Sequence, residues 1–591
     1  MKRKLSFILA LLLILSLFAG CGDKTESSPT AAPASSAPAK TAAPAASAPV
    51  ESAAPASSAP EDESPYRFAN GKFKADENGI ALEKYDYILP ICTTDEELTY
   101  WSVCYSPQAL PQDGFGEMPL PMEVERRTGV QIEYYLLAAD ALKNNFAVLM
   151  ASDSLMDIMC GANRYYTGGA FRKEVEDEGF FVNLYDYREY MPNYMYECTK
   201  DPTDTDTLAR VFTDDELVLC FYELRSTLEL NQGAFARGGW MEKLGLTNDD
   251  VKTFDDLHDM LYGFKSQLGI ETPMSIFSTG DAGNEFIGYD TYGYCSGINT
   301  MYVKQGKVYL SNMGENDREY MTMINNWYNE GLIDPNWASY ATAMDMDPKV
   351  DGNAIGYMTN NWATTMTGHD VFVPEGELGW VPMTKPVRYE GQTLHLGFNV
   401  SRVYSGSASI SAKCENIPLA CTWLDWRYGE EGSFLYGYGV QGVAWDYDET
   451  GNIRISDLIM NYKEVYWSMY MILHALNNLA EPGLYINYTW NVPGNEKTYD
   501  NLLYWYTVPH DNDYVFPSSA VQYTEEQSEV RTRVGADLQT FLQENYLAFI
   551  DNSKPMSEWD AYVEQLHAIG VDEVLEVTQA AYDAYLKKYN L

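Results

Sequence analysis

Basic residues are scarce in this chain of 591 residues. It contains 40 Lys and Arg against 85 Asp and Glu, a formal net charge of −45 at pH 7. Such an acidic surface repels the phosphates of nucleic acid and the headgroups of anionic lipid, so neither is expected as a partner. The surplus charge favours solubility, and an anionic ligand would need basic residues at its binding site.

Histidine is rare as well, and the common catalytic motifs are absent. None of the six histidines lies in HExxH, and the chain contains no GxSxG, no Walker loop and no dinucleotide-binding fingerprint. Carboxylates that are close in sequence do not identify a glycosidase, because the spacing of its two carboxyl groups is a property of the fold. The sequence therefore predicts no enzymatic activity and no cofactor.

The nine cysteines are few for a chain of this length, and no two are spaced as CxxC. Several lie in apolar runs such as "VLCFYEL" and "MDIMC", where cysteine behaves as a small hydrophobic residue. We expect mostly buried free thiols. Cys92 and Cys104 are the pair most worth testing for a disulfide.

Long hydrophobic runs are also missing. Residues 1–20 combine a basic start, a short apolar segment from Phe7 to Phe18 and the small pair Ala19-Gly20, which is typical of a secretory signal. The apolar run is shorter than the ~18–20 residues that span a bilayer. Its end, "LFAGC", resembles the bacterial lipobox, except that Phe18 stands where Leu, Val or Ile is usual. The resemblance implies lipid attachment at Cys21, and the alternative is ordinary cleavage.

Residues 21–65 follow this signal with repeated "AAPA" and "SSAP" and contain almost no large apolar side chain. Such a segment cannot bury enough apolar surface to offset its chain entropy, so we expect a disordered tether. The remainder is long enough for at least two large cores.

Apolar periodicity beyond the tether alternates between strand and helix. The pattern predicts a strand over Tyr85–Cys92, a helix that ends at Gly129, a strand, a helix from Leu142 and a short buried strand. Further along, Thr253 is a predicted N-cap, and residues 525–550 keep a helical stripe. This alternation is typical of an α/β fold with a parallel sheet and crossover helices.

Aromatic residues are abundant, with 46 Tyr and 13 Trp. Sugar rings pack their C–H faces on such side chains, and sugar hydroxyls pair with Asp, Asn, Glu and Arg. Two loop stretches mix these types: "GANRYYTGG" at 161–169 and "YMTNNWATTMTGHD" at 357–370. Most aromatic residues nevertheless serve as core or surface filler.

One stretch resembles a calcium loop. In "DYDETGNIRISD", residues 446–457, acidic and polar residues follow EF-hand spacing with Gly451 at the sixth position. However, the flanks favour strands, and Arg454 adds a positive charge. A β-hairpin explains the same residues without an ion, and no metal is predicted.

Several motifs resemble the extracellular solute-binding proteins of carbohydrate ABC importers, in the branch of the LplA-type and alginate-oligosaccharide-binding lipoproteins. The most specific is "PMSEWDAYVEQLHAIGVDEVLEVTQAAYDAY", residues 555–585. Weaker matches are "RGGWMEKLGL", "TFDDLHDML", "NEGLIDPNW" and "YGEEGSFLYGYGVQGVAW". The chain departs from the family in "ASDSLMDI", which lacks the usual Gly and Pro, and in "FKSQLGIETPMSI", which lacks the calcium loop of the alginate-binding relatives.

The resemblance implies a two-lobed, periplasmic-binding-protein-like type II fold with a hinge that the chain crosses several times. Residues 84–218 and 397–440 are expected to form lobe 1, and residues 219–396 and 441–591 lobe 2. The ligand would lie in the interlobe cleft. The expected ligand-binding residues are Asn163, Arg164, Tyr165, Tyr166, Tyr222, Glu223, Arg237, Trp362 and Trp445.

Together these features predict a monomeric, lipid-anchored binding protein on the outer face of the cell membrane. It would capture a carbohydrate, expected to be an oligosaccharide, by hinge closure and deliver it to the permease subunits of an ABC transporter. A secreted lyase or hydrolase is one alternative, and a lipoprotein that presents a sugar or peptide to a sensor is another.

Overall fold

The computed structural model describes residues 64–166, 171–214, 216–225, 232–277, 286–293, 300–340, 343–397, 401–465, 467–475, 481–486 and 496–591. The predicted signal segment, Cys21 and almost all of the predicted tether lie outside these ranges. Among the described residues, no helix combines the length and the apolar character that a membrane span requires.

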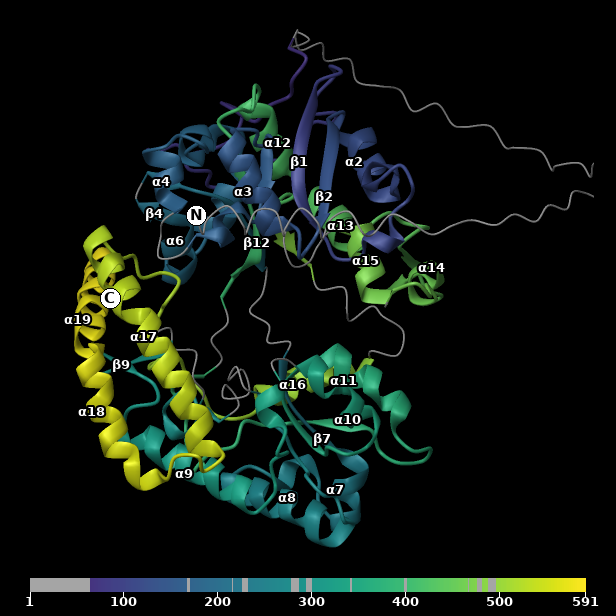
Figure 1. Cartoon of the computed structure of the whole chain (residues 1–591). Helices are drawn as coiled ribbons and strands as arrows, with labels where there is room; N and C mark the ends of the chain where they lie inside the picture. Colours follow the sequence, from purple (N-terminus) through teal and green to yellow (C-terminus); the bar gives the residue numbers. More distant parts are fainter. Residues whose placement is uncertain are drawn as a thin grey trace, which may run out of the picture. The chain divides into compact units, whose positions relative to one another are not determined.

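A six-stranded sheet organises the first lobe, which we define as the described residues of 64–225 and 401–486 (Figure 1). The strand order is β15-β6-β12-β3-β1-β2, and only β12 runs antiparallel to its neighbours. The strands are β1 (Glu97–Cys104), β2 (Gln131–Ala138), β3 (Ile158–Cys160), β6 (Phe221–Arg225), β12 (Val403–Ile410) and β15 (Gly483–Tyr485).

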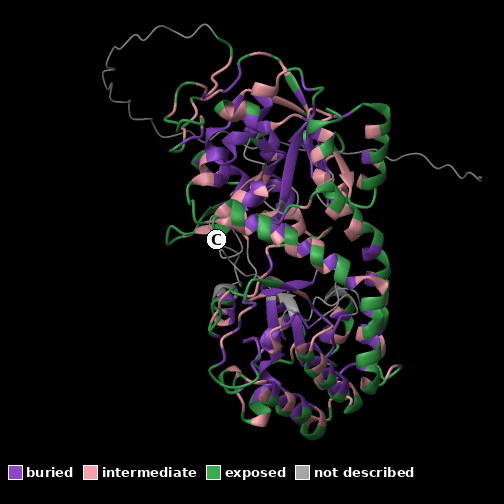
Figure 2. Ribbon diagram, turned by 90° about the vertical axis from the view of Figure 1, so that its left-hand side faces the viewer, coloured by how far each residue is buried: buried purple, intermediate pink, exposed green. Residues whose placement is uncertain are grey.

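Helices cover this sheet and bury its apolar side chains, which Figure 2 shows as buried strands beneath partly exposed helices. The helices of the lobe are α2 (Pro119–Thr128), α3 (Leu142–Ser152), α4 (Phe171–Glu176), α5 (Pro192–Thr199), α6 (Thr205–Val211), α12 (Ile417–Trp426), α13 (Glu430–Tyr438), α14 (Asp457–Met460) and α15 (Trp467–Ala475). Two small hairpins complete it, β4 (Phe212–Asp214) with β5 (Leu217–Val218), and β13 (Trp445–Tyr447) with β14 (Ile453–Ile455).

The second lobe, the described residues of 232–397 and 496–591, has its own hydrophobic core around a three-stranded antiparallel sheet. Its strands are β7 (Gln232–Arg237), β10 (Tyr357–Trp362) and β11 (Trp380–Met383), with a separate hairpin of β8 (Met301–Lys304) and β9 (Lys307–Leu310). Its helices are α7 (Gly238–Leu244), α8 (Phe254–Leu268), α9 (Glu315–Asn329), α10 (Asp347–Asp351), α11 (Ala363–His369), α16 (Glu496–Trp505), α17 (Glu525–Ile550), α18 (Trp559–Ile569) and α19 (Val571–Tyr589).

Local signals in the sequence explain several of these helix ends. α2 ends where Gly129 adopts a left-handed conformation with φ 70°. At the start of α8, Thr253 accepts a hydrogen bond from the Asp256 amide, and the Asp256 carboxylate bonds back to the Thr253 amide. This reciprocal pair satisfies amide groups that a helix N-terminus leaves without partners. Both helix ends and the bounds of α17 confirm the predictions.

The strand predicted over Tyr85–Cys92 is wrong, because this segment is irregular and the first strand is β1. Pro90 lacks the backbone N–H that a central strand would donate, and the Tyr85 amide bonds to the Asn193 side chain instead. The α/β class with a largely parallel sheet is confirmed.

The sheet also places two segments differently from the expected lobe boundaries. β6 and β15 pair within the first lobe's sheet, whereas residues 219–225 and 441–486 were expected in the second lobe. β6 has five residues and β15 three. Such short runs carry little periodicity, so only their pairing partners reveal the lobe to which they belong.

The described cysteines carry free thiols, and all of them are buried. Cys92 and Cys104 are both in this group, so they form no disulfide with each other here. Burial raises the pKa of Cys160 to about 12 and favours the unreactive protonated thiol. Cys21 and Cys295 lie outside the described residues.

Candidate functional site

Five of the six strands in the first lobe's sheet run in one direction, so their carboxyl ends meet at one edge. We call this the carboxyl edge. The chain passes between the lobes three times beside it: after Arg225, before Val403 and after Tyr485. In open α/β sheets ligands bind beyond the carboxyl ends of the strands, which makes this edge the candidate site.

The loop after β3 brings the predicted residue Asn163 to this edge. The Asn163 Oδ1 accepts a hydrogen bond from the Ser407 Oγ on β12 at 2.6 Å, and the Gly161 amide donates to the Ser407 carbonyl at 2.9 Å. Because its oxygen is held, Asn163 can offer its amide nitrogen as a donor. Arg164, the next residue, is exposed.

Tyr165 and Tyr166 follow in the same loop but are partly committed to packing. The Tyr165 ring stacks on Phe146 with centroids 4.9 Å apart, and Tyr166 meets Phe146 at 6.1 Å and Phe171 at 5.2 Å. Burial and the nearby Glu174 raise the pKa of Tyr166 to about 12. Both tyrosines remain half-buried, so each presents only part of its ring.

Tyr222 and Glu223 on β6 reach the same edge. Tyr222 lies opposite Ser407 in the strand register. The Glu223 carboxyl is 1% exposed, and its Oε2 accepts a hydrogen bond from the Gly406 amide at 2.9 Å. Its Oε1 is buried and has no hydrogen-bond partner among the described residues. Burial raises the pKa of Glu223 to about 7.

Three residues that the sequence analysis missed gather beside them: Arg225, Tyr404 and Tyr485. The Arg225 guanidinium lies 3.7 Å from the centroid of the Tyr404 ring and 5.9 Å from that of Tyr485. The two ring centroids are 6.1 Å apart. Each residue belongs to a different strand, so no local motif joins them. The only available signal was their place at the strand ends that border the crossings.

A buried polar network lies deeper in the same lobe. The Glu481 carboxylate accepts hydrogen bonds from the Ser102 Oγ at 2.6 Å and from the Arg427 Nη1 at 3.2 Å, and it also contacts the Tyr100 hydroxyl. Burial raises the pKa of Glu481 to about 8. The network joins β1, the start of β15 and the end of α12, and its side chains are fully buried, so we assign it a structural role.

In the second lobe, Trp362 ends β10 opposite Gln232, the first residue of β7 after the crossing. Its backbone therefore borders the crossing, and its side chain lies outside what the structure describes. Arg237 ends β7 at the opposite end of the strand, 1% exposed. Its guanidinium lies 5.0 Å from the Trp240 ring and 5.6 Å from the Trp380 ring, so the strand separates Arg237 from Trp362.

The Trp445 side chain packs elsewhere in the first lobe and not at the carboxyl edge. It is 3% exposed, its ring contacts Phe434 and Tyr438, and its indole N–H donates to the Gly439 carbonyl at 3.0 Å. These contacts fill a small hydrophobic cluster between α13 and α15. Of the predicted residues, the structure therefore brings Asn163, Tyr222 and Glu223 together.

The EF-hand-like stretch forms the β13–β14 hairpin, the alternative that needs no ion. Asp448 accepts hydrogen bonds from the Thr450 and Asn452 amides at 2.8 and 3.0 Å, and Arg454 pairs with Asp457 at 2.8 Å. Asp448 therefore stabilises the turn of the hairpin through these hydrogen bonds.

Among the described residues, one other group could hold a metal ion: His395, Asp511 and Asp513, with ligand atoms within 4.8 Å of one another. The His395 Nδ1 lies 3.0 Å from Asp511, so a simple histidine–carboxylate pair accounts for this contact.

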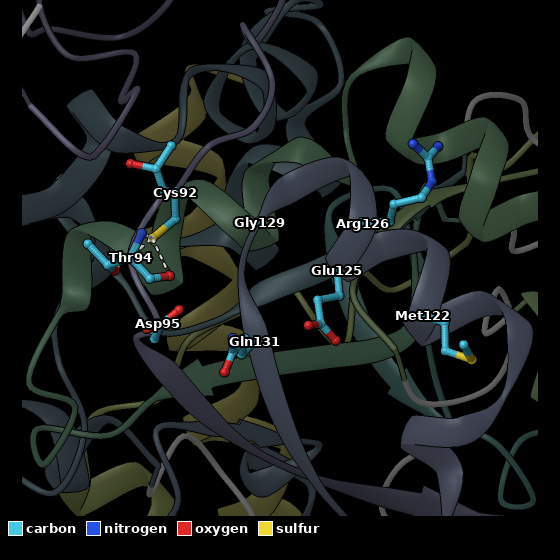
Figure 3. A pocket seen from close by; sticks show the side chains of 9 residues that line it. Cys92, Thr94, Asp95, Met122, Glu125, Arg126, Gly129 and Gln131 are labelled. Carbon is cyan, nitrogen blue, oxygen red and sulfur yellow. Dashed lines mark hydrogen bonds between the residues drawn. The ribbon is translucent and has the colours of Figure 1, made fainter.

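The opposite edge of the same sheet, where β1 and β2 begin, contains an open cavity of about 450 Å³ (Figure 3). We call this the amino edge. The cavity is lined by Cys92, Thr93, Thr94, Asp95, Met122, Glu125, Arg126, Gly129 and Gln131. Asp95 and Glu125 are exposed. The Arg126 guanidinium forms an ion pair with the Glu123 carboxylate at 2.6 Å. None of the predicted ligand residues lines this cavity.

No family model matches the chain. One curated relative is the fructooligosaccharide ABC transporter substrate-binding protein FusA of Streptococcus pneumoniae, 25% identical over 384 residues, or 61% of this chain and 67% of FusA. Among solved structures, FusA from the same organism in complex with kestose has a TM-score of 0.63 and 19% identity, covering 83% of this chain and 100% of FusA. The alginate-binding protein AlgQ2 without calcium has a TM-score of 0.60 and 22% identity, covering 83% of this chain and 99% of AlgQ2.

The chain therefore has the fold of the solute-binding proteins of ABC transporters. It is similar to proteins of this fold that bind carbohydrates, which confirms the resemblance indicated by the sequence motifs.

Proposed function

We propose that this chain captures an oligosaccharide between its two lobes and delivers it to the permease of an ABC transporter. The carboxyl edge carries the proposal: hydrogen-bonding and aromatic side chains gather there, beside all three passages of the chain between the lobes. The relatives support the ligand class, since FusA is a fructooligosaccharide-binding protein and AlgQ2 an alginate-binding protein.

Capture would proceed by closure of the lobes about these three crossings. A ligand that contacts both lobes binds the closed form better than the open form, and it shifts the population by that difference in affinity. Contacts among the described residues already join α4 and α6 of the first lobe to helices of the second. Lys173 on α4 pairs with Glu525 on α17, and the Thr205 hydroxyl lies 3.3 Å from that of Tyr585 on α19. The Lys173–Glu525 pair is weak enough to break during closure, because exposed ion pairs contribute ~0–1 kcal/mol.

The ligand would meet Asn163, Arg164, Tyr165, Tyr166, Tyr222 and Glu223 from the first lobe and Trp362 from the second. Arg237 and Trp445 are left out of this set. Arg237 is buried beside Trp240 and Trp380 at the far end of β7, and Trp445 is packed inside a hydrophobic cluster. The protein would release its ligand unchanged, as expected from its similarity to substrate-binding proteins.

Residues 1–65 support a proposal for where the protein is located in the cell. A lipid on Cys21 and the Ser/Pro/Ala-rich tether would hold a monomer on the outer face of the cell membrane, within reach of permease subunits. Intact mass after extraction from the membrane tests the anchor. A diacylglycerol-modified Cys21 is expected, and an unmodified mature chain would contradict it.

A thermal-shift screen tests the ligand class, because a ligand that binds only the folded state raises the melting temperature. The panel contains kestose, nystose, maltotriose, cellotriose, an alginate trisaccharide and a tripeptide. At 100 times Kd the expected stabilisation is about 2.7 kcal/mol for at least one oligosaccharide. A shift with the tripeptide alone, or no shift with any sugar, would overturn the carbohydrate assignment.

The same sugars, incubated with the protein and examined by mass spectrometry, test the absence of catalysis. We expect each to be recovered intact. Appearance of shorter or unsaturated products would replace the transport proposal with the hydrolase or lyase alternative.

A further inference from the structure

One residue from each of the three strands that border the crossings meets at the carboxyl edge: Arg225 from β6, Tyr404 from β12 and Tyr485 from β15. The Arg225 guanidinium lies over the Tyr404 ring at 3.7 Å and closer to it than to Tyr485, at 5.9 Å. The rings are inclined to each other by 56°. Arg225 is 7% exposed, while both tyrosines are half-buried and present part of their surface.

The backbone holds Arg225 firmly in this place. Its amide donates to the Arg402 carbonyl at 2.7 Å, and the Arg402 Nε donates to the Arg225 carbonyl at 3.1 Å. Arg402 is itself paired with Glu197 at 3.1 Å and with Asp204 at 3.4 Å. A guanidinium and an aromatic ring face attract each other, so the fixed Arg225 also fixes the plane of Tyr404.

A hydrogen-bond acceptor lies on the same face of β6 as Arg225. Glu223 is two residues before Arg225 on β6, so both side chains leave the strand on the same face. The Gly406 amide holds one carboxyl oxygen of Glu223, and the other oxygen is buried without a partner among the described residues. A buried oxygen without a partner destabilises the fold, and a ligand hydroxyl that donates to it would remove this cost.

We propose that Tyr404 and Tyr485 form a stacking platform for one uncharged sugar unit, with Arg225 as the residue that positions Tyr404 and Glu223 as the acceptor for a sugar hydroxyl. This proposal rests on the proposed function and narrows its substrate class. The C–H face of the sugar packs on a tyrosine ring, and a neighbouring hydroxyl donates to the Glu223 Oε1.

The charges at the platform favour a neutral oligosaccharide over a uronic acid oligomer. Two cations lie near the platform, but Arg225 is buried against the Tyr404 ring and Arg164 belongs to the separate loop after β3. A sugar carboxylate on the tyrosine rings would therefore be brought beside the buried Glu223 carboxyl. Two carboxyl groups in one desolvated site resist joint ionisation. Kestose should therefore bind better than the alginate trisaccharide.

Calorimetric titration of the whole chain with kestose, or with the neutral panel sugar that gives the largest thermal shift, tests the platform. Tyr404→Leu and Tyr485→Leu should each raise Kd ~10-fold or more, while Tyr404→Phe and Tyr485→Phe should stay within ~3-fold, because Phe keeps the ring face. Tyr447→Leu is the matched control, since Tyr447 is 55% exposed on the β13–β14 hairpin. It should bind as the parent does.

Arg225→Lys separates a positioning role from a structural one. It keeps the charge but loses the flat guanidinium, so the Kd for the sugar should rise ~3-fold or more. In the Arg225→Lys background, the difference in Kd between Tyr404→Phe and Tyr404→Leu should be smaller than in the parent background. A residue that only stabilises the fold would leave that difference unchanged, and such a result would remove Arg225 from the platform.

The outcomes keep the two proposals apart. If the parent binds kestose and both leucine variants bind it equally well, the platform is wrong and the transport proposal stands. If the alginate trisaccharide binds better than every neutral sugar, the neutral-sugar assignment is wrong. If no sugar binds the parent, the proposed function itself is overturned.

Discussion

The two edges of the six-stranded sheet carry different kinds of polar group. At the carboxyl edge, the Glu223 carboxyl is buried with a pKa raised to about 7, and Arg225 is buried against aromatic rings. At the amino edge, Asp95 and Glu125 are exposed to solvent around an open cavity. Both edges have hydrogen-bonding side chains, but Glu223 and Arg225 at the carboxyl edge are withdrawn from water, whereas Asp95 and Glu125 at the amino edge are not.

This difference follows from topology. Strands that run in parallel bring their carboxyl ends together, and three of the six strands border passages between the lobes there. Neighbouring strands then cover one another's side chains. Polar groups that are buried at such an edge cost stability unless they are used, which is why shifted pKa values gather at functional sites. Solvated carboxylates at the amino edge carry no such cost.

The largest effect is expected from Gly406→Ala at the carboxyl edge. A Cβ at this position would lie 2.1 Å from the Glu481 carbonyl oxygen and 2.8 Å from the Glu223 Cβ. The Glu481 carbonyl belongs to the backbone just before β15 and cannot rotate away, so the strands must separate. We expect the free energy of unfolding to fall by about 4 kcal/mol. Urea denaturation measures it. Gly116→Ala, where no atom lies within 4 Å, is the control, and equal losses in the two variants would refute the tight packing of this edge.

A smaller effect is expected from Glu223→Gln, and it depends on pH. Burial raises the pKa of Glu223 from 4.5 to about 7, so the folded state binds this proton more tightly than the unfolded state does. The resulting stability is fully present below pH ~4.5 and is lost as the pH rises through 7. Glutamine has no proton to lose, so from pH 5 to pH 8 the variant should gain about 2 kcal/mol relative to the parent.

Denaturation of both proteins at several pH values measures this gain. Glu125→Gln makes the same chemical change at an exposed position of the amino edge and is the matched control. A Glu223→Gln variant whose stability follows the parent at every pH would mean that Glu223 is ionised in the folded state.

The smallest effect is expected at the amino edge. The double variant Asp95→Asn, Glu125→Gln removes two exposed carboxylates from the cavity of Figure 3. Surface substitutions of this kind change stability by less than about 0.5 kcal/mol. Calorimetry should give an unchanged Kd for kestose. A 10-fold weaker affinity would show that the ligand site extends to this edge and would contradict the functional difference between the two edges.

The helices were the most predictable part of the fold because their signals are local. Thr253 and Asp256 lie within one turn, and Gly129 can adopt the left-handed conformation at a helix end without steric cost. The stripe over residues 525–550 matches α17 residue for residue, since its apolar face needs only one regular period.

The site was less predictable because it depends on residues that are distant in sequence. Asn163 and Glu223 were predicted from motifs, and they meet only because both bond to the β12 segment at Gly406 and Ser407. Arg237 was also predicted as a ligand residue, yet it is the last residue of β7 and lies at the end of the strand that is away from the crossing.

The sequence by itself determined the acidic charge, the helix ends and the α/β alternation, because composition and short-range periodicity encode them. Tertiary structure alone decided that Arg225, Tyr404 and Tyr485 stand together and that one oxygen of Glu223 is buried without a partner. The order of strands in the sheet sets these contacts, and strand order arises from pairing between distant segments that no local pattern records.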